Sequence, residues 1–299
     1  MATRAVPPVL SFCALAVLGA AAALRGGSAT DVLNAVEPKG GVAVAHDLAY
    51  GEGPRRMLDV YAPHGATGRA PVVVFFYGGG WETGRRQDYA FVGAALASRG
   101  YVTVIPDYRL HPEVDWTGLL QDSALAVRWA RDHAAQYGGD PDRLVLMGHS
   151  AGAYNAAMLA LDARWLGAVG MDPHQDVRAM VGLAGPYDFL PVRTEVLKAV
   201  FGPEAQRPDT QPINHVAAPV PPLFLATDDR DKVVDPGNSA RLAAAARAKG
   251  GEAEVRVYRG LNHALMVGVI ATPLRFLAPV LRDAGAFIDA QTAEPGTRP

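Results

Sequence analysis

The pentapeptide Gly-His-Ser-Ala-Gly at residues 148–152 restricts the fold of this chain more than any other feature of its sequence. An apolar run of strand character, residues 143–147, precedes it, and residues 153–161 after it are rich in Ala, Leu and Met at helical spacing. A serine in this strand–turn–helix context predicts a sharp turn that exposes the hydroxyl of Ser150 above a sheet. Glycines suit such a turn because, without a Cβ, they let strand and helix approach each other closely.

Further strand-like stretches alternate with helical ones along the chain. The first two, residues 42–50 and 57–61, are separated by turn residues 51–54, which predicts an antiparallel pair. The continuous apolar run at 72–76 is typical of a strand buried on both faces of a parallel sheet, and 179–183 is expected to be another buried strand. Further strands are expected at 101–106, 223–227 and 254–258. Helices are expected at 88–98, 118–137, 238–249 and 273–290. This alternation predicts an α/β fold with a mostly parallel central sheet of about eight strands and helices on both faces.

The length of 299 residues and the content of 49% hydrophobic and 19% charged residues are typical of a globular protein with one large core. Residues 30–290 are therefore expected to form one domain, which begins with a polar joint at 31–41. The proline-rich segment 185–222 interrupts the alternation and is predicted to be a cap-like excursion above the sheet, where a substrate pocket is built. Residues 291–299 are expected to be a flexible tail.

The N-terminal segment, residues 1–29, has the pattern of an export signal. Arg4 precedes an apolar stretch at 6–24, and small residues follow it. The apolar stretch is also near the length that spans a bilayer, so a retained membrane anchor is the alternative. A buried N-terminal helix is the third possibility. The sequence predicts a periplasmic or secreted protein, or one anchored to the membrane by this segment.

Several classes of function are disfavoured by composition and spacing. The formal net charge is -2, with no basic run that would bind nucleic acid. Cys13 is the one cysteine, so neither an intrachain disulfide nor a cysteine metal cluster can form. The glycines at 79–84 superficially resemble a phosphate-binding loop, but Arg85 and Arg86 stand where such a loop requires Lys followed by Ser or Thr. The sequence predicts no metal and no cofactor.

A serine hydroxyl needs a neighbouring base, which is usually oriented by a carboxylate. Only two histidines lie late in the chain. His263 directly follows the last predicted strand, in a loop that could turn back over Ser150, and is the predicted base. His215 and His174 are expected on surface loops, and His149 is expected to provide packing or polar support.

The acid is expected in the loop at 228–235, which follows the predicted strand 223–227 and contains four aspartates. Asp231 is preferred because it stands just before the apolar pair at 233–234, which should anchor the loop. Asp228 is the main alternative. The remaining candidates, assigned to capping, solvent or a weaker alternative position, are Asp229, Asp235 and Asp188.

Attack on a carbonyl group produces a negatively charged oxygen, which backbone N–H groups stabilise. The glycine loop at 78–81 follows the strand 72–76 and supplies unhindered amides. The predicted oxyanion donors are the amides of Gly79, Gly80 and Ala151. Trp81 and Tyr154, beside these motifs, are predicted to contact the substrate.

These motifs resemble those of the α/β-hydrolase superfamily, in the esterase/lipase branch that includes bacterial carboxylesterases and arylformamidase-like enzymes. The resemblance covers about residues 40 to 290 and rests on 58–63, 77–81, 106–110, 126–129 with Asp122, the serine pentapeptide, the Asp231 loop and His263. The branch has histidine before the loop glycines, whereas this chain has Tyr77. A phenol must therefore make the hydrogen bond that normally steadies the loop, or that bond is lost.

The resemblance and the residues together predict a serine hydrolase that cleaves a small-molecule carboxylic ester through an acyl-enzyme. Ser150 would attack, His263 would carry the proton, and Asp231 would hold the imidazole. Hydrolysis of an aryl formamide or another amide is the alternative within the same chemistry. A non-catalytic binding module is the alternative from another class. The sequence leaves the oligomeric state open.

Overall fold

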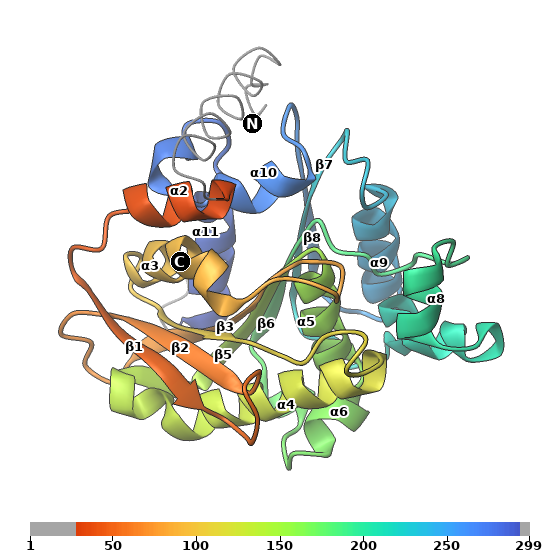
Figure 1. The fold of residues 1–299 in the computed structure, drawn as a ribbon, viewed down its shortest axis with the longest axis horizontal. Coiled ribbons are helices and arrows are strands. Elements are labelled where there is room, and N and C mark those ends of the chain that lie inside the picture. The colour runs from red at the N-terminus through yellow and green to blue at the C-terminus, as the bar shows by residue number, and fades with distance from the viewer. Residues whose placement is uncertain (1–27, 294–299) are drawn as a thin grey trace.

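A central eight-stranded sheet organises the computed structural model, which describes residues 28–293 (Figure 1). The strand order is β1-β2-β4-β3-β5-β6-β7-β8, and β2 alone runs against the others. The strands are β1 (Val42–Ala49), β2 (Met57–Pro63), β3 (Ala70–Phe76), β4 (Val102–Pro106), β5 (Gly139–His149), β6 (Ala179–Leu183), β7 (Leu223–Asp228) and β8 (Ala253–Tyr258). The predicted fold class is confirmed.

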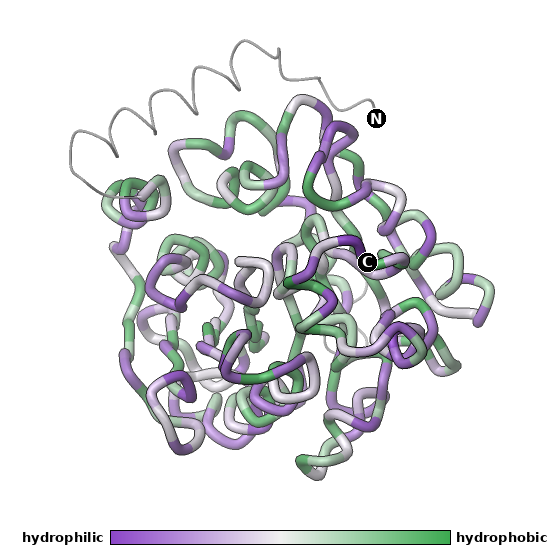
Figure 2. Tube along the Cα trace, turned by 45° about the vertical axis from the view of Figure 1, so that its right-hand side comes forward, coloured by the Kyte–Doolittle hydropathy of each residue, from purple (hydrophilic) through white to green (hydrophobic). Residues whose placement is uncertain are grey.

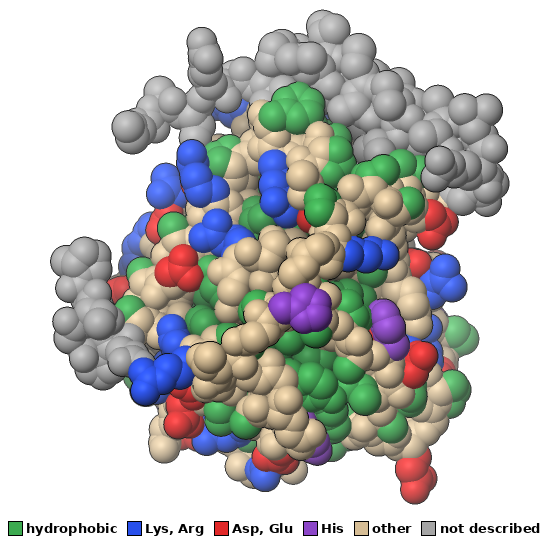
Figure 3. Space-filling model, turned by 90° about the vertical axis from the view of Figure 1, so that its left-hand side faces the viewer, with side chains coloured by type: hydrophobic (Ala, Val, Ile, Leu, Met, Phe, Trp, Pro, Cys, Tyr) green, Lys and Arg blue, Asp and Glu red, His purple; other side chains and the backbone are tan. Residues whose placement is uncertain are grey.

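Helices cover both faces of this sheet, α3 and α11 on one and α4, α5 and α9 on the other (Figure 1). Their bounds are α3 (Ala90–Ala97), α11 (Val280–Thr292), α4 (Trp116–His133), α5 (Ala151–Leu161) and α9 (Gly237–Ala248). Residues 72–76 of β3 are fully buried between the two layers, as a continuous apolar run requires. Hydrophilic residues gather on the outer turns (Figure 2), and on the β1 side of the molecule basic and acidic side chains are interspersed (Figure 3).

The predicted polar joint at 31–41 is wrong in its first half, where the chain forms helix α2 (Ala29–Val36). The Ser28 hydroxyl accepts a hydrogen bond from the Asp31 amide, and the Asp31 carboxylate accepts one from the Ser28 amide. This reciprocal cap satisfies two N–H groups at the start of the helix. Residues 1–27 of the predicted export segment lie outside the described residues, so that segment stays a prediction. In the part of the chain that is described, no helix is long and apolar enough to cross a membrane.

The C-terminal helix differs from its prediction at both ends. A 3-10 turn at Thr272–Leu274 is followed by α11, which begins at Val280, directly after Pro279, and ends at Thr292. Pro279 marks the start because proline suits the N-terminal boundary of a helix and not its interior. The first two residues of the predicted tail therefore belong to α11, and residues 294–299 lie outside the described part.

The proline-rich excursion contains only short helices. They are α8 (Glu195–Phe201) and 3-10 helices at Glu204–Thr210 and Pro212–His215. Leu197 of α8 and Arg241 of α9 line the same cavity. The first part of the excursion forms a wall of the cavity described below. Three short helices that the sequence did not predict complete the fold: α6 (Ala163–Gly167), α7 (Pro173–Asp176) and α10 (His263–Gly268).

Candidate active site

Ser150 occupies a strained turn between β5 and α5. Its φ is 54° and its ψ is -124°, a left-handed backbone conformation that is unusual for a residue with a side chain. The flanking glycines are required by close contacts. A Cβ added to Gly148 would lie 2.2 Å from the Gly152 carbonyl oxygen, and one added to Gly152 would lie 2.1 Å from the Phe76 carbonyl oxygen. The turn therefore holds its serine in the position that the pentapeptide predicts.

Ser150, His263 and Asp231 form one hydrogen-bonded chain. Asp231 Oδ2 lies 2.7 Å from His263 Nδ1, and His263 Nε2 lies 2.8 Å from Ser150 Oγ. The carboxylate can only accept, so Nδ1 carries the proton of the neutral imidazole and Nε2 accepts from the serine hydroxyl. The Asp231 side chain is fully buried and that of His263 is 15% exposed. The three predicted catalytic residues are thus brought together in the geometry of a nucleophile, base and orienting acid.

The carboxylate of Asp231 is fixed by the backbone that follows it. Its Oδ1 accepts hydrogen bonds from the amides of Val233 (2.8 Å) and Val234 (3.0 Å), which leaves Oδ2 for the imidazole. The expectation that this apolar pair anchors the loop by burial is wrong, because Val233 is 72% exposed. The pair orients the acid through its N–H groups.

The other acids of this region have different partners. Asp228 is buried and accepts hydrogen bonds from the amides of Arg230 and Leu261. Burial raises its pKa. Asp188 and Asp235 both pair with Arg241, and Asp229 lies 3.9 Å from Arg259. Of these candidates, Asp231 makes the hydrogen bond to His263.

The backbone of His263 is held from two sides. It begins the short helix α10, whose N-cap Asn262 accepts a hydrogen bond from the Leu265 amide at 2.9 Å. The Nε2–H of His149 donates to the His263 carbonyl oxygen at 2.9 Å, which matches the polar support predicted for His149. His215 was expected on an exposed loop, but its side chain is only 14% exposed and contacts the Asp209 carbonyl.

His149 should make the protein sensitive to acid. Burial, aided by the neighbouring His263, lowers the pKa of His149 to about 3, from an ordinary value near 6.5. Below about pH 6.5 the unfolded chain binds a proton here that the folded protein does not bind until about pH 3. The free energy of unfolding therefore decreases as the pH is lowered through that window, by about 1.4 kcal/mol per pH unit.

His149→Gln removes this titration while keeping a donor for the His263 carbonyl. Between about pH 7 and about pH 4.5, the wild-type protein should lose about 2 to 3 kcal/mol more unfolding free energy than the variant. Urea unfolding at both pH values measures the difference. Parallel losses in the two proteins would contradict a neutral, buried His149.

A cavity of about 480 Å³ opens beside Ser150, and Gly80, Trp81 and Ala151 also line it. Ala151 is the first residue of α5, so its N–H has no partner within that helix. Gly79, with φ of 130°, makes the turn before them; a Cβ there would lie 2.1 Å from the Thr83 carbonyl oxygen. The placement agrees with the predicted oxyanion site, and the donor role of the three amides stays a prediction.

Trp81 forms a wall of the cavity and is rigidly supported. Its indole N–H donates to Asn155 Oδ1 at 3.2 Å, and its ring packs edge-on against Tyr154 (5.3 Å) and Phe201 (4.9 Å). Tyr154 is fully buried and is not among the cavity-lining residues. The predicted contact of Tyr154 with substrate is therefore replaced by a supporting role behind Trp81.

Segments that follow β6 and β7 form the rest of the cavity wall. Apolar side chains come from the proline-rich excursion and from the loop that carries the acid: Phe189, Leu190, Val192, Leu197, Val233 and Val234. Charged side chains also line it: Asp188, Arg193, Asp235 and Arg241. The high proline content of the excursion was the one sequence signal for this wall. Among residues 28–293, no group of three or more His, Cys, Asp or Glu side chains could hold a metal ion.

The mostly parallel sheet, the serine turn after β5 and the acid and histidine after β7 and β8 are the features of an α/β-hydrolase, with Ser150 at the position of its nucleophile. The family model described as BD-FAE matches residues 58–245, more than half of the chain, and the chain belongs to this family. The family lies in the esterase/lipase group of α/β-hydrolases, as the resemblance implied.

Relatives among known proteins are esterases by name. The chain is 31% identical over 243 residues to the probable isoprenylcysteine alpha-carbonyl methylesterase ICMEL1 of Arabidopsis thaliana, covering 74% of this chain and 51% of that protein. It is 31% identical over 206 residues to esterase LipC of Mycobacterium tuberculosis, covering 62% and 51%. The chain thus spans about half the length of the curated relatives it matches.

The fold is shared with solved structures. Esterase B from Lactobacillus rhamnosis superimposes with a TM-score of 0.76 at 22% identity, covering 93% of this chain and 96% of that chain.

Proposed function

We propose that this protein is a serine carboxylesterase that hydrolyses small esters through an acyl-enzyme. The observation that carries the proposal is the Asp231–His263–Ser150 chain, with distances of 2.7 and 2.8 Å, at the edge of a largely apolar cavity. Membership of the BD-FAE family and the esterase names of the relatives support it. Turnover of p-nitrophenyl butyrate tests it directly, and a folded protein that hydrolyses no ester would contradict it.

The residues account for each proton in two half-reactions. Ser150 Oγ attacks the ester carbonyl carbon and transfers its proton to His263 Nε2, while Asp231 stabilises the imidazolium that forms. The imidazolium then gives that proton to the departing alkoxide, which leaves as an alcohol. The acyl group remains bound to Ser150 as an ester. A water molecule attacks the acyl-serine with His263 again as base, and the acid is released as the serine is regenerated.

The cavity favours a compact, apolar acyl group. Trp81 forms the cavity wall near Ser150. Its indole is held by the hydrogen bond to Asn155 and by the aromatic rings that pack against it. Because the ring cannot easily turn aside, it limits the space on its side of the cavity. We assign this side to the acyl group, which makes Trp81 a determinant of chain length.

Trp81→Ala should shift the preference toward longer acyl chains. Each buried methylene contributes about 0.8 kcal/mol, so two more accommodated methylenes correspond to about tenfold in kcat/KM. In a p-nitrophenyl ester series, the octanoate-to-butyrate ratio of kcat/KM should rise by about that factor. Phe276→Ala, which removes an aromatic ring that is 71% exposed and outside the cavity lining, is the control and should leave the ratio unchanged. An unchanged ratio in Trp81→Ala would remove this assignment.

A further inference from the structure

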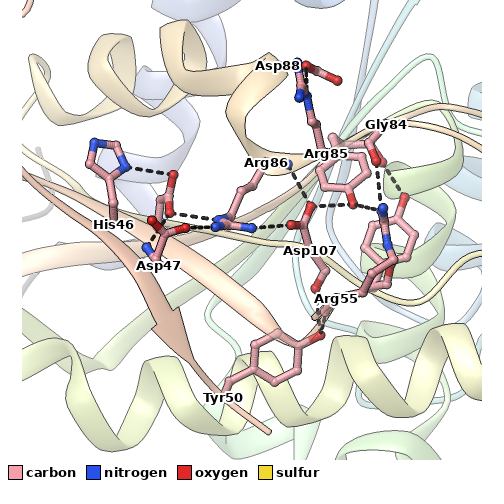
Figure 4. A network of polar contacts seen from close by, with 12 residues as sticks. His46, Asp47, Tyr50, Arg55, Gly84, Arg85, Arg86, Asp88 and Asp107 are labelled. Atoms are coloured by element: carbon pink, nitrogen blue, oxygen red, sulfur yellow. Dashed lines mark hydrogen bonds and ion pairs between the residues drawn. The ribbon is translucent and has the colours of Figure 1, made fainter. Parts of the chain in front are cut away.

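The loop that carries the predicted oxyanion amides is tied together at its two ends by one arginine. We define the oxyanion loop as residues 77–84. Arg55 Nη2 donates to the Tyr77 hydroxyl at 2.8 Å and to the Gly84 carbonyl at 2.8 Å, so a single nitrogen contacts the first and last residues of the loop. Its Nε donates to the Tyr108 carbonyl at 2.9 Å, which anchors the guanidinium to the chain just after β4 (Figure 4).

A buried carboxylate holds the same two ends from another direction. Asp107, at the end of β4, is 4% exposed. Its Oδ1 accepts from the Tyr77 hydroxyl at 2.9 Å and from the Arg86 amide at 2.8 Å, just beyond the loop. Its Oδ2 pairs with the Arg86 guanidinium (Figure 4). Burial raises the pKa of Tyr77 well above its ordinary value, so the phenol keeps the proton that it donates to Asp107.

The ring of Tyr77 is fixed independently of its hydroxyl. It stacks on Tyr108 with centroids 4.8 Å apart and on Tyr89 with centroids 5.6 Å apart. The Tyr108 hydroxyl donates to the Tyr77 carbonyl at 2.8 Å. The phenol thus takes the place of the histidine that the resembled branch has here, and its hydroxyl contacts both Arg55 and Asp107.

Small displacements of this loop affect the reaction centre because it lies against the nucleophile. A Cβ added to Gly78 would be only 3.0 Å from the Cβ of Ser150. Oxyanion donors act only when aimed at the atom on which charge develops, and a misplacement of about 1 Å can cost about a hundredfold in rate. Whatever fixes the two ends of the loop therefore controls how well its amides are aimed.

We propose that Arg55 and Asp107 are positioning residues that clamp the two ends of the oxyanion loop and keep its amides aimed at the developing oxyanion. The inference rests on the proposed ester hydrolysis. Neither residue lines the cavity beside Ser150. Their effect passes through Tyr77 and Gly84, so it appears in stabilisation of the transition state and not in binding of the ground state.

Tyr77→Phe and Arg55→Leu test the clamp. Tyr77→Phe keeps the stacked ring and removes both hydroxyl contacts, whereas Arg55→Leu removes the bridge to Gly84. Each should lower kcat for p-nitrophenyl butyrate about 10- to 100-fold with KM changed less than about twofold. The affinity for an alkyl trifluoromethyl ketone, which forms a tetrahedral oxyanion adduct with the serine, should weaken in parallel with kcat.

Arg109→Leu is the matched control. Arg109 is half-buried like Arg55, but its guanidinium contacts the buried carboxylate of Asp122, which Arg56 also contacts. This variant should keep the wild-type kcat and ketone affinity. Circular dichroism verifies folding of every variant, and Tyr77→Phe provides the milder change should Arg55→Leu not fold.

The clamp is supported if kcat and ketone affinity fall together in the two test variants and not in Arg109→Leu. It is overturned if Tyr77→Phe folds and keeps the wild-type kcat, or if Arg109→Leu loses as much activity as the test variants. If the wild-type protein hydrolyses no ester, the proposed function fails and the clamp fails with it. An active wild-type enzyme with an equally active Tyr77→Phe removes the clamp alone.

Discussion

Replacing Ser150 with alanine is expected to lower kcat for p-nitrophenyl butyrate by about 10⁴- to 10⁶-fold, because Ser150 carries the hydroxyl that is hydrogen-bonded to His263 Nε2. The change removes one oxygen and keeps the Cβ that packs against Gly78, so the fold should survive. Substrate should bind with little change, since the cavity wall is otherwise intact. Steady-state kinetics with a thermal unfolding control measures both effects. Hydrolysis at the wild-type rate by a folded Ser150→Ala would exclude this serine as nucleophile.

Asp231→Asn is expected to have the second largest effect, lowering kcat by about 10⁴-fold. An asparagine at this position can turn its NH₂ toward His263 Nδ1, which then becomes the acceptor. The proton would move to Nε2, and the imidazole could no longer accept the proton of Ser150. The loss should appear in kcat while the cavity and the fold are retained.

Asp228→Asn separates the two acids that competed for this role. Its amide oxygen can still accept from the Leu261 amide, which lies 3.0 Å from the Asp228 carboxylate, while its NH₂ group gives up the contact with the Arg230 amide. Because neither contact involves the His263 imidazole, kcat should stay near the wild-type value. A larger loss in Asp228→Asn than in Asp231→Asn, with both variants folded, would reverse the assignment. The comparison uses the same ester and the same pH for all three proteins.

The sheet could be predicted from the sequence because its central strands are buried on both faces. Runs such as residues 72–76 and 179–183 are continuously apolar, which leaves little choice of structure between turn signals. Short helices were harder to predict from the sequence. The capping pair of helix α2 is split between two predicted segments. Ser28 falls in the predicted export segment and Asp31 in the predicted joint, so the cap could not be recognised.

The triad could be predicted because strand ends in a parallel sheet meet at one edge. Ser150 follows β5, the Asp231 loop follows β7 and His263 follows β8, so the topology brings all three residues together. Asp231 makes the hydrogen bond to His263, although the physical reason differs from the expected one. Its carboxylate is oriented by two backbone amides and not by burial of the valines, and a sequence pattern does not show the direction of an N–H group.

The support of the oxyanion loop could not be predicted. The sequence showed that Tyr77 departs from the usual histidine, but its partners Arg55 and Asp107 lie 22 and 30 positions away in the chain. Their contact depends on the antiparallel pairing of β2 with β4, which places the chain before β2 next to the end of β4. Such contacts belong to tertiary structure and leave no local periodicity in the sequence.

Trapping of the acyl-enzyme tests directly whether Ser150 is the nucleophile. The wild-type protein and Ser150→Ala are mixed with p-nitrophenyl acetate, quenched in acid during the initial burst, digested and examined by mass spectrometry. We expect an acetyl group on Ser150 in the wild-type protein and none on the corresponding peptide of the variant. Rapid ester turnover by the wild-type protein with the acetyl group on a different residue, or with equal labelling of the Ser150→Ala variant, would contradict it.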